Sequence, residues 1–204
     1  MLAIIQARTS SKRFPKKVLY KINSKPLIIW VVNNVLKSKL ISNLIIATSK
    51  DKSDNQLVNL IKKSKYKFYR GSLKNVALRM LKVAQINNAK YFVRLSGDSP
   101  LIDYKIINRA IKILKKNKNI DIVTNVFPRT YPSGQSIEII KTKILKKYIS
   151  NFNRSEKEHV TTFFYSNSNK FRIINFKKNT NNYKNLPKLS IDYKSDLKKI
   201  RKFI

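Results

Sequence analysis

The sequence predicts an α/β fold built on a mostly parallel sheet. Short apolar runs alternate with segments of helical periodicity through about residue 124, which is the order of strand–helix–strand units. After Phe127 this alternation stops, and residues 135–140 alternate polar and apolar side chains, as an antiparallel or edge strand does. The 204 residues contain no internal repeat and no linker, so we expect a single domain over residues 1–204.

The first part of the chain supplies the parallel strands and the helices between them. Residues 2–7 are an apolar run that predicts a buried strand, and the polar, Pro-punctuated residues 8–17 predict a loop. Leu27–Leu36 has helical spacing, with Pro26 at the helix start, where proline is tolerated. Further strands are expected at 43–49, 66–69, 91–95 and 120–124, and further helices at 53–63 (capped by Ser53 or Asp54), 75–87 and 103–116 (capped by Asp103).

The second part of the chain has a different pattern. Residues 129–134, RTYPSG, predict a turn-rich loop. Residues 177–188 are polar and rich in Asn, which is typical of a mobile loop. Strands are expected at 171–176 and 189–193, and helices at 142–150, 155–165 and 195–204.

The net charge of +35 comes mainly from 35 lysines that are spread along the whole chain. A polynucleotide site would instead gather its cations on one arm or face. We therefore interpret the charge as a solvated, Lys-rich surface, with a nucleic-acid site as the less favoured alternative. The field of such a surface would still attract small polyanions such as nucleotides.

The Cys and His content excludes several classes of protein. With no Cys, the chain cannot be a disulfide scaffold, hold a Cys-ligated metal or use a thiol nucleophile. Its one His, His159, cannot form a multi-His metal site. No apolar run approaches the ~20 residues of a membrane helix. We expect a cytoplasmic protein with no membrane partner.

Candidate functional residues follow the expected strands, because ligands of parallel sheets bind outside the carboxyl ends of the strands. The loop after the first strand carries Arg8, Arg13 and Lys17, three cations that can hold a triphosphate, and Pro15 stiffens it. A basic surface loop without a ligand is an equally open interpretation. The chain contains neither a Walker A loop nor a dinucleotide-binding glycine pattern.

Two aspartates also stand at expected strand ends. Asp98 lies in LSGDSP at 95–100, where Gly97 allows the backbone to approach closely, and Asp192 lies in LSIDY at 189–193. Mg²⁺ takes one or two carboxylates together with phosphate oxygens, so the pair is a candidate magnesium site. The alternative is that each aspartate caps the helix that follows it. Capping is the favoured interpretation for Asp103 and Asp196.

The segment IIQARTSSKRFPKKVL at 4–19 resembles the signature loop of sugar cytidylyltransferases of the spore-coat polysaccharide type. That family is related to the cytidylyltransferases of 3-deoxy-manno-octulosonate (KDO) and of the acylneuraminates, which make CMP-sialic acids. The resemblance runs nearly end to end, and six of the ten Arg fall within its motifs. It continues at 47–49 (ATS), 70–72 (RGS), 76–79, 94–103 (RLSGDSPLID), 125, 128–134 (PRTYPSG), 138, 158–161 (EHVT), 191–193 (IDY) and 196–197.

The resemblance implies a role for each motif. The loop from Ala7 to Lys17 would hold the CTP phosphates, and Arg8, Arg13, Lys17 and Asp98 would be the catalytic set. Asp98 and Asp192 would hold Mg²⁺. Residues 47–49 (with Ser49), Gly71 and Arg79 would lie near the nucleoside, and Arg129, Tyr131, Gly134, Glu138, Glu158 and His159 would line the sugar side.

The resemblance further implies a three-layer α/β/α fold like that of nucleotide-diphospho-sugar transferases, with an antiparallel excursion. The expected reaction transfers CMP from CTP to an acidic keto-acid sugar and releases pyrophosphate, for surface polysaccharide biosynthesis. The expected partners are CTP, the sugar and a second copy of the chain. Residues 128–176 would form the sugar-side and possible dimerisation subregion, with 135–140 as a candidate interface strand.

The chain departs from the family pattern at several positions. Ser10 replaces a small residue that is often Gly, Lys74 and Asn75 stand where an acid is usual, and Ser136 replaces an acid in the sugar-side motif. These departures leave three alternatives open. The chain could use UTP or GTP, act as a glycosyltransferase-like protein, or be an inactive protein that binds nucleotide sugars.

Overall fold

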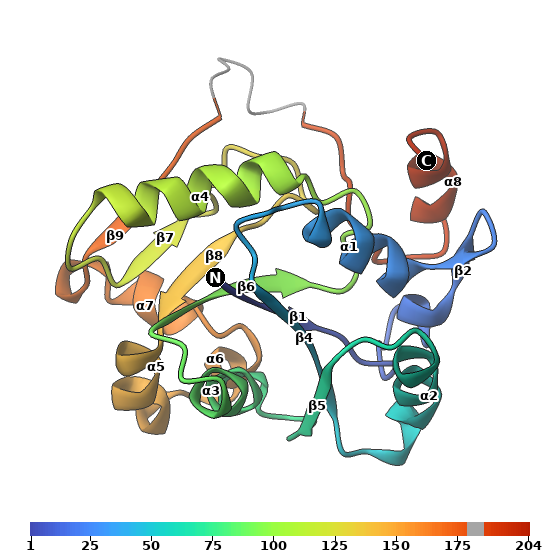
Figure 1. Ribbon diagram of the computed structural model, residues 1–204, viewed down its shortest axis with the longest axis horizontal. Coiled ribbons are helices and arrows are strands. Elements are labelled where there is room, and N and C mark those ends of the chain that lie inside the picture. Colours follow the sequence, from blue (N-terminus) through green and yellow to red (C-terminus); the bar gives the residue numbers. More distant parts are fainter. Residues whose placement is uncertain (179–185) are drawn as a thin grey trace.

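The computed structural model describes residues 1–178 and 186–204, and it confirms the expected three-layer α/β/α fold. Seven strands form one sheet in the order β5-β4-β1-β6-β8-β7-β9. In Figure 1 the sheet runs through the middle of the molecule, with α1 and α4 on one side and α3 and α5 on the other.

Four parallel strands make up one half of the sheet. They are β1 (Leu2–Gln6), β4 (Asn43–Ser49), β5 (Phe68–Gly71) and β6 (Tyr91–Ser96). β1 lies in the middle of this half and pairs in parallel with both β4 and β6. Since the four strands run the same way, the loops that follow them lie at the same edge of the sheet.

The antiparallel excursion is also confirmed, but its strand lies inside the sheet. β8 (Glu138–Lys141) pairs antiparallel with β6 on one side and with β7 (Ile122–Thr124) on the other. β9 (Ile173–Asn175) then pairs in parallel with β7 and ends the sheet. Because both edges of β8 are occupied, it is not an edge strand and cannot pair with a strand of a second copy.

Two apolar cores lie between the sheet and the helical layers on its two faces. One core joins the sheet to α1 (Leu27–Leu36), α2 (Asn55–Lys63), α4 (Tyr104–Lys116) and α8 (Asp196–Arg201). The other joins it to α3 (Val76–Ile86), α5 (Thr142–Tyr148) and α7 (Thr162–Ser166), with α6 (Arg154–Glu158) against α3. A small hairpin of β2 (Lys21–Ile22) and β3 (Lys25–Pro26) precedes α1. Within the described ranges, no helix is long and apolar enough to cross a membrane.

The single helix expected at 155–165 is wrong, since α6 ends at Glu158 and α7 begins at Thr162. The chain turns inward between them, where Val160 is fully buried in the second core. The buried Thr161 hydroxyl donates a hydrogen bond of 2.5 Å to Glu138 Oε1. The break between the two helices allows both side chains to be buried, and it leaves His159 at the C-terminal end of α6.

The strand expected at 189–193 is also absent. Leu189 N donates to Ser133 O at 2.8 Å, and Ile191 N donates to Asp98 O at 2.9 Å. The segment is therefore held between two loops rather than in a sheet ladder. A smaller difference is that β5 starts two residues later than expected. Of the loop expected at 177–188, residues 179–185 lie outside the described residues.

Candidate active site

The end of β6 lies unusually close to the end of β1. Gly97 N donates to Gln6 O at 2.8 Å, and a Cβ at Gly97 would lie 2.9 Å from the same oxygen. Any larger residue would push the two strand ends apart. This close approach brings Asp98 over the loop that follows β1, as the sequence predicts.

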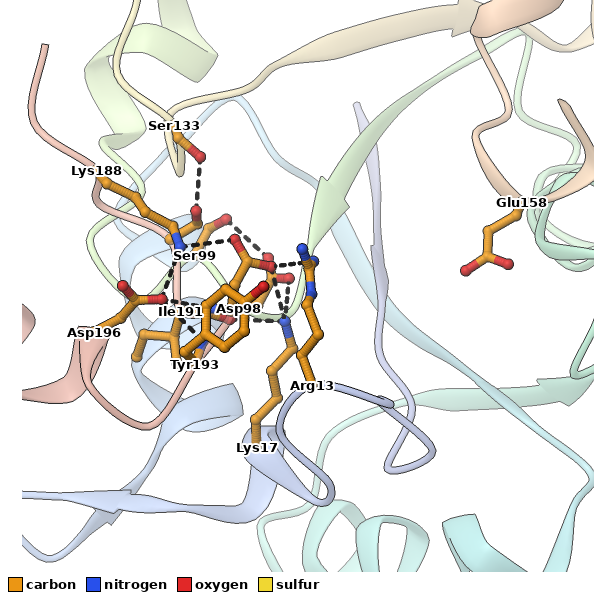
Figure 2. A network of polar contacts seen from close by, with 12 residues as sticks. Arg13, Lys17, Asp98, Ser99, Ser133, Glu158, Lys188, Ile191, Tyr193 and Asp196 are labelled. Carbon is orange, nitrogen blue, oxygen red and sulfur yellow. Dashed lines mark hydrogen bonds and ion pairs between the residues drawn. The ribbon is translucent and has the colours of Figure 1, made fainter. Parts of the chain in front are cut away.

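Asp98 and Asp192, 94 positions apart in the chain, converge on one cation. The Lys17 ammonium donates to Asp98 Oδ2 at 2.7 Å and lies 3.8 Å from Asp192 Oδ1. It also donates to Ile191 O at 2.7 Å, and its side chain is 10% exposed. Figure 2 shows Lys17 and Arg13 pointing into this cluster from the first loop. The two aspartates therefore share one polar centre.

A turn built around Asp196 presents Asp192 to this centre. Asp196 Oδ2 accepts hydrogen bonds from the backbone amides of Asp192 at 2.8 Å and Tyr193 at 2.9 Å, and from Lys188 Nζ at 2.8 Å. Burial alone raises the pKa of Asp196, but the hydrogen bonds from Lys188 and the two amides outweigh it and lower the pKa to about 2. Asp196 thus organises the turn instead of capping α8 as predicted.

Lys188 is a site residue that the sequence analysis missed. Its ammonium lies 3.1 Å from Asp192 Oδ2 as well as 2.8 Å from Asp196 Oδ2. Lys188 lies four residues before Asp192, a spacing that predicts a contact only within a helix, and no helix covers this segment. Only the fold brings the two side chains together.

The three cations of the first loop do not gather at one point. Arg13 donates to Asp192 Oδ1 at 2.7 Å and so joins Lys17 at the aspartate pair. Arg8 instead forms a close ion pair with Glu158. Figure 2 shows Glu158 well apart from the aspartate cluster. Arg8 and Glu158 therefore form a second polar centre, which also places Glu158 away from the expected sugar-side group.

Asp54 connects the first loop to the end of β4, a role that the sequence analysis did not predict. The fully buried carboxylate accepts from Thr9 N at 2.7 Å, Thr9 Oγ1 at 2.9 Å and Ser49 N at 3.1 Å, and also from the Ser49 hydroxyl. Burial alone raises the pKa of Asp54, yet the hydrogen bonds from Ser49 and Thr9 outweigh it and lower the pKa. Asp54 does not cap α2 through its side chain.

We expect Asp54→Asn to lower the free energy of unfolding by about 1–3 kcal/mol, because an amide group would face buried donors and leave them unpaired. Denaturant unfolding at pH 7 measures the change. Asp51→Asn is the matched control, since Asp51 accepts from Ser53 N in an exposed turn that asparagine also caps well. Equal stability of the two variants would refute this role of Asp54.

The expected nucleoside-side residues lie around α3 and the end of β5. Arg79 is 2% exposed; its Nη1 contacts Ser72 O, and its Nε has no hydrogen-bond partner. Burial, together with the neighbouring charge of Arg8, lowers the pKa of Arg79 to about 10. A Cβ at Gly71 would lie 3.0 Å from Arg79 Cγ, so this glycine leaves room for the arginine.

A cavity of about 350 Å³ opens beside the aspartate pair. Asp98 and Asp192 line one end of it together with Ser190 and Ser133. Four of the six residues expected on the sugar side line it too: Arg129, Gly134, Glu138 and His159. Tyr131 does not, because it packs edge-on against Phe176 in the core and its hydroxyl accepts from Arg109.

Glu138 forms the buried wall of the cavity. It pairs with Arg94 and accepts from the hydroxyls of Thr161 at 2.5 Å and Tyr165 at 2.7 Å. Burial alone raises the pKa of Glu138, but Arg94 and the two hydroxyl groups outweigh it and keep the pKa below its ordinary value. Glu138 is therefore a charged, fully partnered group at pH 7.

Arg129 stands at the cavity as an exposed cation. Its Nη1 donates to Ser136 Oγ at 2.9 Å, and the described residues give it no carboxylate partner. The Ser136 hydroxyl group carries no charge, so this contact leaves the guanidinium charge uncompensated. Such a guanidinium can bind a carboxylate in a bidentate manner.

The aspartate pair fits a magnesium ion that is shared with phosphate. In the part of the chain that is described, no three His, Cys, Asp or Glu side chains gather as a complete protein metal site would. Two carboxylates around one cation, the Lys17 ammonium, are nevertheless present. Since Mg²⁺ uses one or two carboxylates plus phosphate oxygens, this donor set suits Mg²⁺ carried by a nucleotide.

Comparisons with known proteins agree with this geometry. Residues 2–203 match a family model described as cytidylyltransferase. The chain is 29% identical over 181 residues to a spore coat polysaccharide biosynthesis protein of Bacillus subtilis, covering 85% of this chain and 73% of that protein. It is 33% identical over 128 residues to the 3-deoxy-manno-octulosonate cytidylyltransferase of Fusobacterium nucleatum, covering 60% and 49%. A solved cytidylyltransferase from Leptospira borgpetersenii superposes with a TM-score of 0.91 at 29% identity, covering 98% and 84%.

Proposed function

Because the chain belongs to the cytidylyltransferase family, whose members are nucleotidyltransferases, we propose that it transfers CMP from CTP to an acidic keto-acid sugar with release of pyrophosphate. The likeness to a spore coat polysaccharide protein and to a KDO cytidylyltransferase supports a product used in surface polysaccharide biosynthesis. The observation that carries the proposal is that one cavity is lined both by the aspartate pair and by Arg129 and His159.

The first loop is the proposed phosphate site. Arg13 and Lys17 extend from it to Asp192 and Asp98, which line the cavity, and would bind the β- and γ-phosphates there. Asp98 and Asp192 would hold Mg²⁺, which when bound neutralises charge on the α-phosphate and on the leaving pyrophosphate. A sugar hydroxyl attacks the α-phosphorus, its new P–O bond replaces the bond from the α-phosphorus to the oxygen that bridges to the β-phosphate, pyrophosphate leaves, and the hydroxyl proton passes to solvent water. Positioning and charge stabilisation supply most of the rate.

The far end of the cavity is the proposed sugar site. Its volume of about 350 Å³ lies within the range of small-molecule sites. Arg129 would bind the sugar carboxylate, while the fully partnered Glu138 would shape the wall and hold Arg94 in place. The hydroxyl groups of Thr161, Thr162 and Ser136 offer hydrogen bonds to a polyol.

We expect Arg129→Gln to raise the KM for an acidic sugar by about tenfold or more, because a charge-assisted contact is lost. The KM for CTP should change less than about twofold, since Arg129 does not touch the aspartate cluster. Steady-state pyrophosphate release measures both constants. Arg154→Gln, an exposed arginine at the start of α6, is the matched control. An unchanged sugar KM in Arg129→Gln would show that the carboxylate binds elsewhere.

The function itself is tested by incubating the protein with Mg²⁺ and a set of sugar acids, in separate reactions that each contain one nucleoside triphosphate. Mass spectrometry should find a CMP-linked sugar acid with CTP, and no corresponding product with ATP, GTP or UTP. A UMP- or GMP-linked product would show that UTP or GTP, and not CTP, is the nucleotide donor. The absence of any product across the set, with CTP bound, would favour the inactive nucleotide-sugar binding protein.

A further inference from the structure

The Lys17 ammonium lies at the place where the two aspartates converge. It comes within 2.7 Å of Asp98 Oδ2 and 3.8 Å of Asp192 Oδ1, and Ile191 O accepts its third contact at 2.7 Å. A lysine with its side chain only 10% exposed and three oxygens around its nitrogen is a fixed internal cation. Figure 2 shows that it reaches this point from the first loop, toward the turn on which Ile191, Tyr193 and Asp196 are labelled.

Charge is balanced within this cluster. Three carboxylates, Asp98, Asp192 and Asp196, face three cations, which are Arg13, Lys17 and Lys188. Both oxygens of Asp192 are engaged, Oδ1 by Arg13 at 2.7 Å and Oδ2 by Lys188 at 3.1 Å. The free protein therefore presents no excess negative charge to a divalent cation at this point.

We propose that Lys17 is an internal cation that holds the place of the divalent metal in the free protein and gives it up only when a nucleoside triphosphate binds. This inference rests on the proposed function. A triphosphate carries about four negative charges at neutral pH and draws Lys17 and Arg13 to itself. Asp98 and Asp192 are then left with a negative charge that attracts the metal.

The consequence is a strong coupling between the two ligands. Metal binds weakly to the free protein and tightly to the nucleotide complex, and by linkage the metal strengthens nucleotide binding by the same factor. The arrangement also keeps two neighbouring carboxylates compensated while the site is empty of nucleotide. Lys17 would thus have two roles: it neutralises Asp98 and Asp192 in the free protein, and it binds the phosphates once the nucleotide is present.

The first measurement uses the wild-type protein and Mn²⁺, a paramagnetic substitute for Mg²⁺. Electron paramagnetic resonance counts free Mn²⁺ with and without cytidine 5′-(α,β-methylene)triphosphate, an analogue that cannot release pyrophosphate. We expect the analogue to tighten Mn²⁺ binding to the protein by at least about tenfold beyond its own affinity for Mn²⁺. Equal Mn²⁺ affinity in the two conditions, at analogue concentrations where the analogue is shown to be bound, would overturn the proposal.

The second measurement uses Mn²⁺ alone and removes the internal cation. We expect Lys17→Met to bind Mn²⁺ at least about tenfold more tightly than the wild type, because a nearby positive charge no longer opposes it. Lys17→Arg, which keeps the charge, should restore weak Mn²⁺ binding. Lys21→Met removes one exposed charge of the same kind from β2 and should change the affinity by less than about twofold.

Adding Asp98→Asn to Lys17→Met should abolish the gain, which assigns the new Mn²⁺ to this pair of aspartates. A Lys17→Met protein that unfolds at the wild-type temperature but binds Mn²⁺ no better would refute the internal cation. Failure of the proposed function is a different result, because CTP and its analogue would then not bind. The Mn²⁺-only comparison uses no nucleotide and decides the inference in either case.

Discussion

Replacing Asp98 with asparagine is expected to lower nucleotidyl transfer by at least about a thousandfold and to leave the fold intact. Asparagine has the same size, and its carbonyl oxygen can still accept from Lys17 at the position where Asp98 Oδ2 does at 2.7 Å. It has no negative charge, so it is a far poorer magnesium ligand. Pyrophosphate release from CTP with a working sugar measures the loss, and circular dichroism measures the unfolding temperature.

Asp103→Asn is the matched control for this variant. Asp103 lies five residues further along the same loop, and its carboxylate caps α4 by accepting from Lys105 N at 2.8 Å. Asparagine is an equally good cap, so this variant should keep its activity and its stability. Near-normal turnover of Asp98→Asn would refute the metal role of Asp98.

A methyl group at Gly134 is expected to lower activity by at least about a hundredfold, because it displaces the segment that carries Asp192. Gly134 has φ of +93°, and a Cβ there would lie 2.4 Å from Leu189 C and 2.5 Å from Leu189 O. Both atoms are backbone atoms and cannot rotate away. Gly134→Ala must therefore move residues 189–193 and with them Asp192, besides straining its own backbone.

Loss of stability alone must be separated from this displacement. Leu57→Ala, in the fully buried side of α2, should cost about 2–5 kcal/mol without touching the cavity. At a temperature where both variants are folded, Leu57→Ala should turn over normally and Gly134→Ala should not. If Gly134→Ala kept wild-type activity, Asp192 would not need its present position.

The individual strands and helices of the first part of the chain were predictable because each depends on a local pattern. The apolar run that forms β1 and the spacing of Leu27–Leu36 belong to single elements, and both are confirmed. The position of β8 was not predictable, since the polar–apolar alternation shows that a strand has two unlike faces but says nothing about which neighbours it pairs with. The break at His159 likewise depends on burying Val160 and Thr161 under a distant strand.

The site was predictable in its charged groups and not in their pairing. Asp98, Asp192, Arg13 and Lys17 were identified from strand ends and family motifs, and the fold brings them together. Their mutual ion pairs, and the contact between Asp192 and Lys188, depend on a turn. This turn belongs to no helix or strand, so no sequence pattern predicts it. In a chain with 45 Lys and Arg, all ten acids accept hydrogen bonds in the structure: Asp51, Asp54, Asp98, Asp103, Asp121, Glu138, Glu156, Glu158, Asp192 and Asp196.

In the proposed complex two distant aspartates, Asp98 and Asp192, would hold one divalent cation against a nucleoside triphosphate. Anomalous diffraction from crystals grown with Mn²⁺ and cytidine 5′-(α,β-methylene)triphosphate tests it most directly. We expect a manganese peak in contact with carboxylate oxygens of both Asp98 and Asp192 and with a phosphate oxygen, with the Lys17 ammonium moved onto the phosphates. A manganese peak that touches neither aspartate, with Lys17 still bound to Asp98, would contradict it.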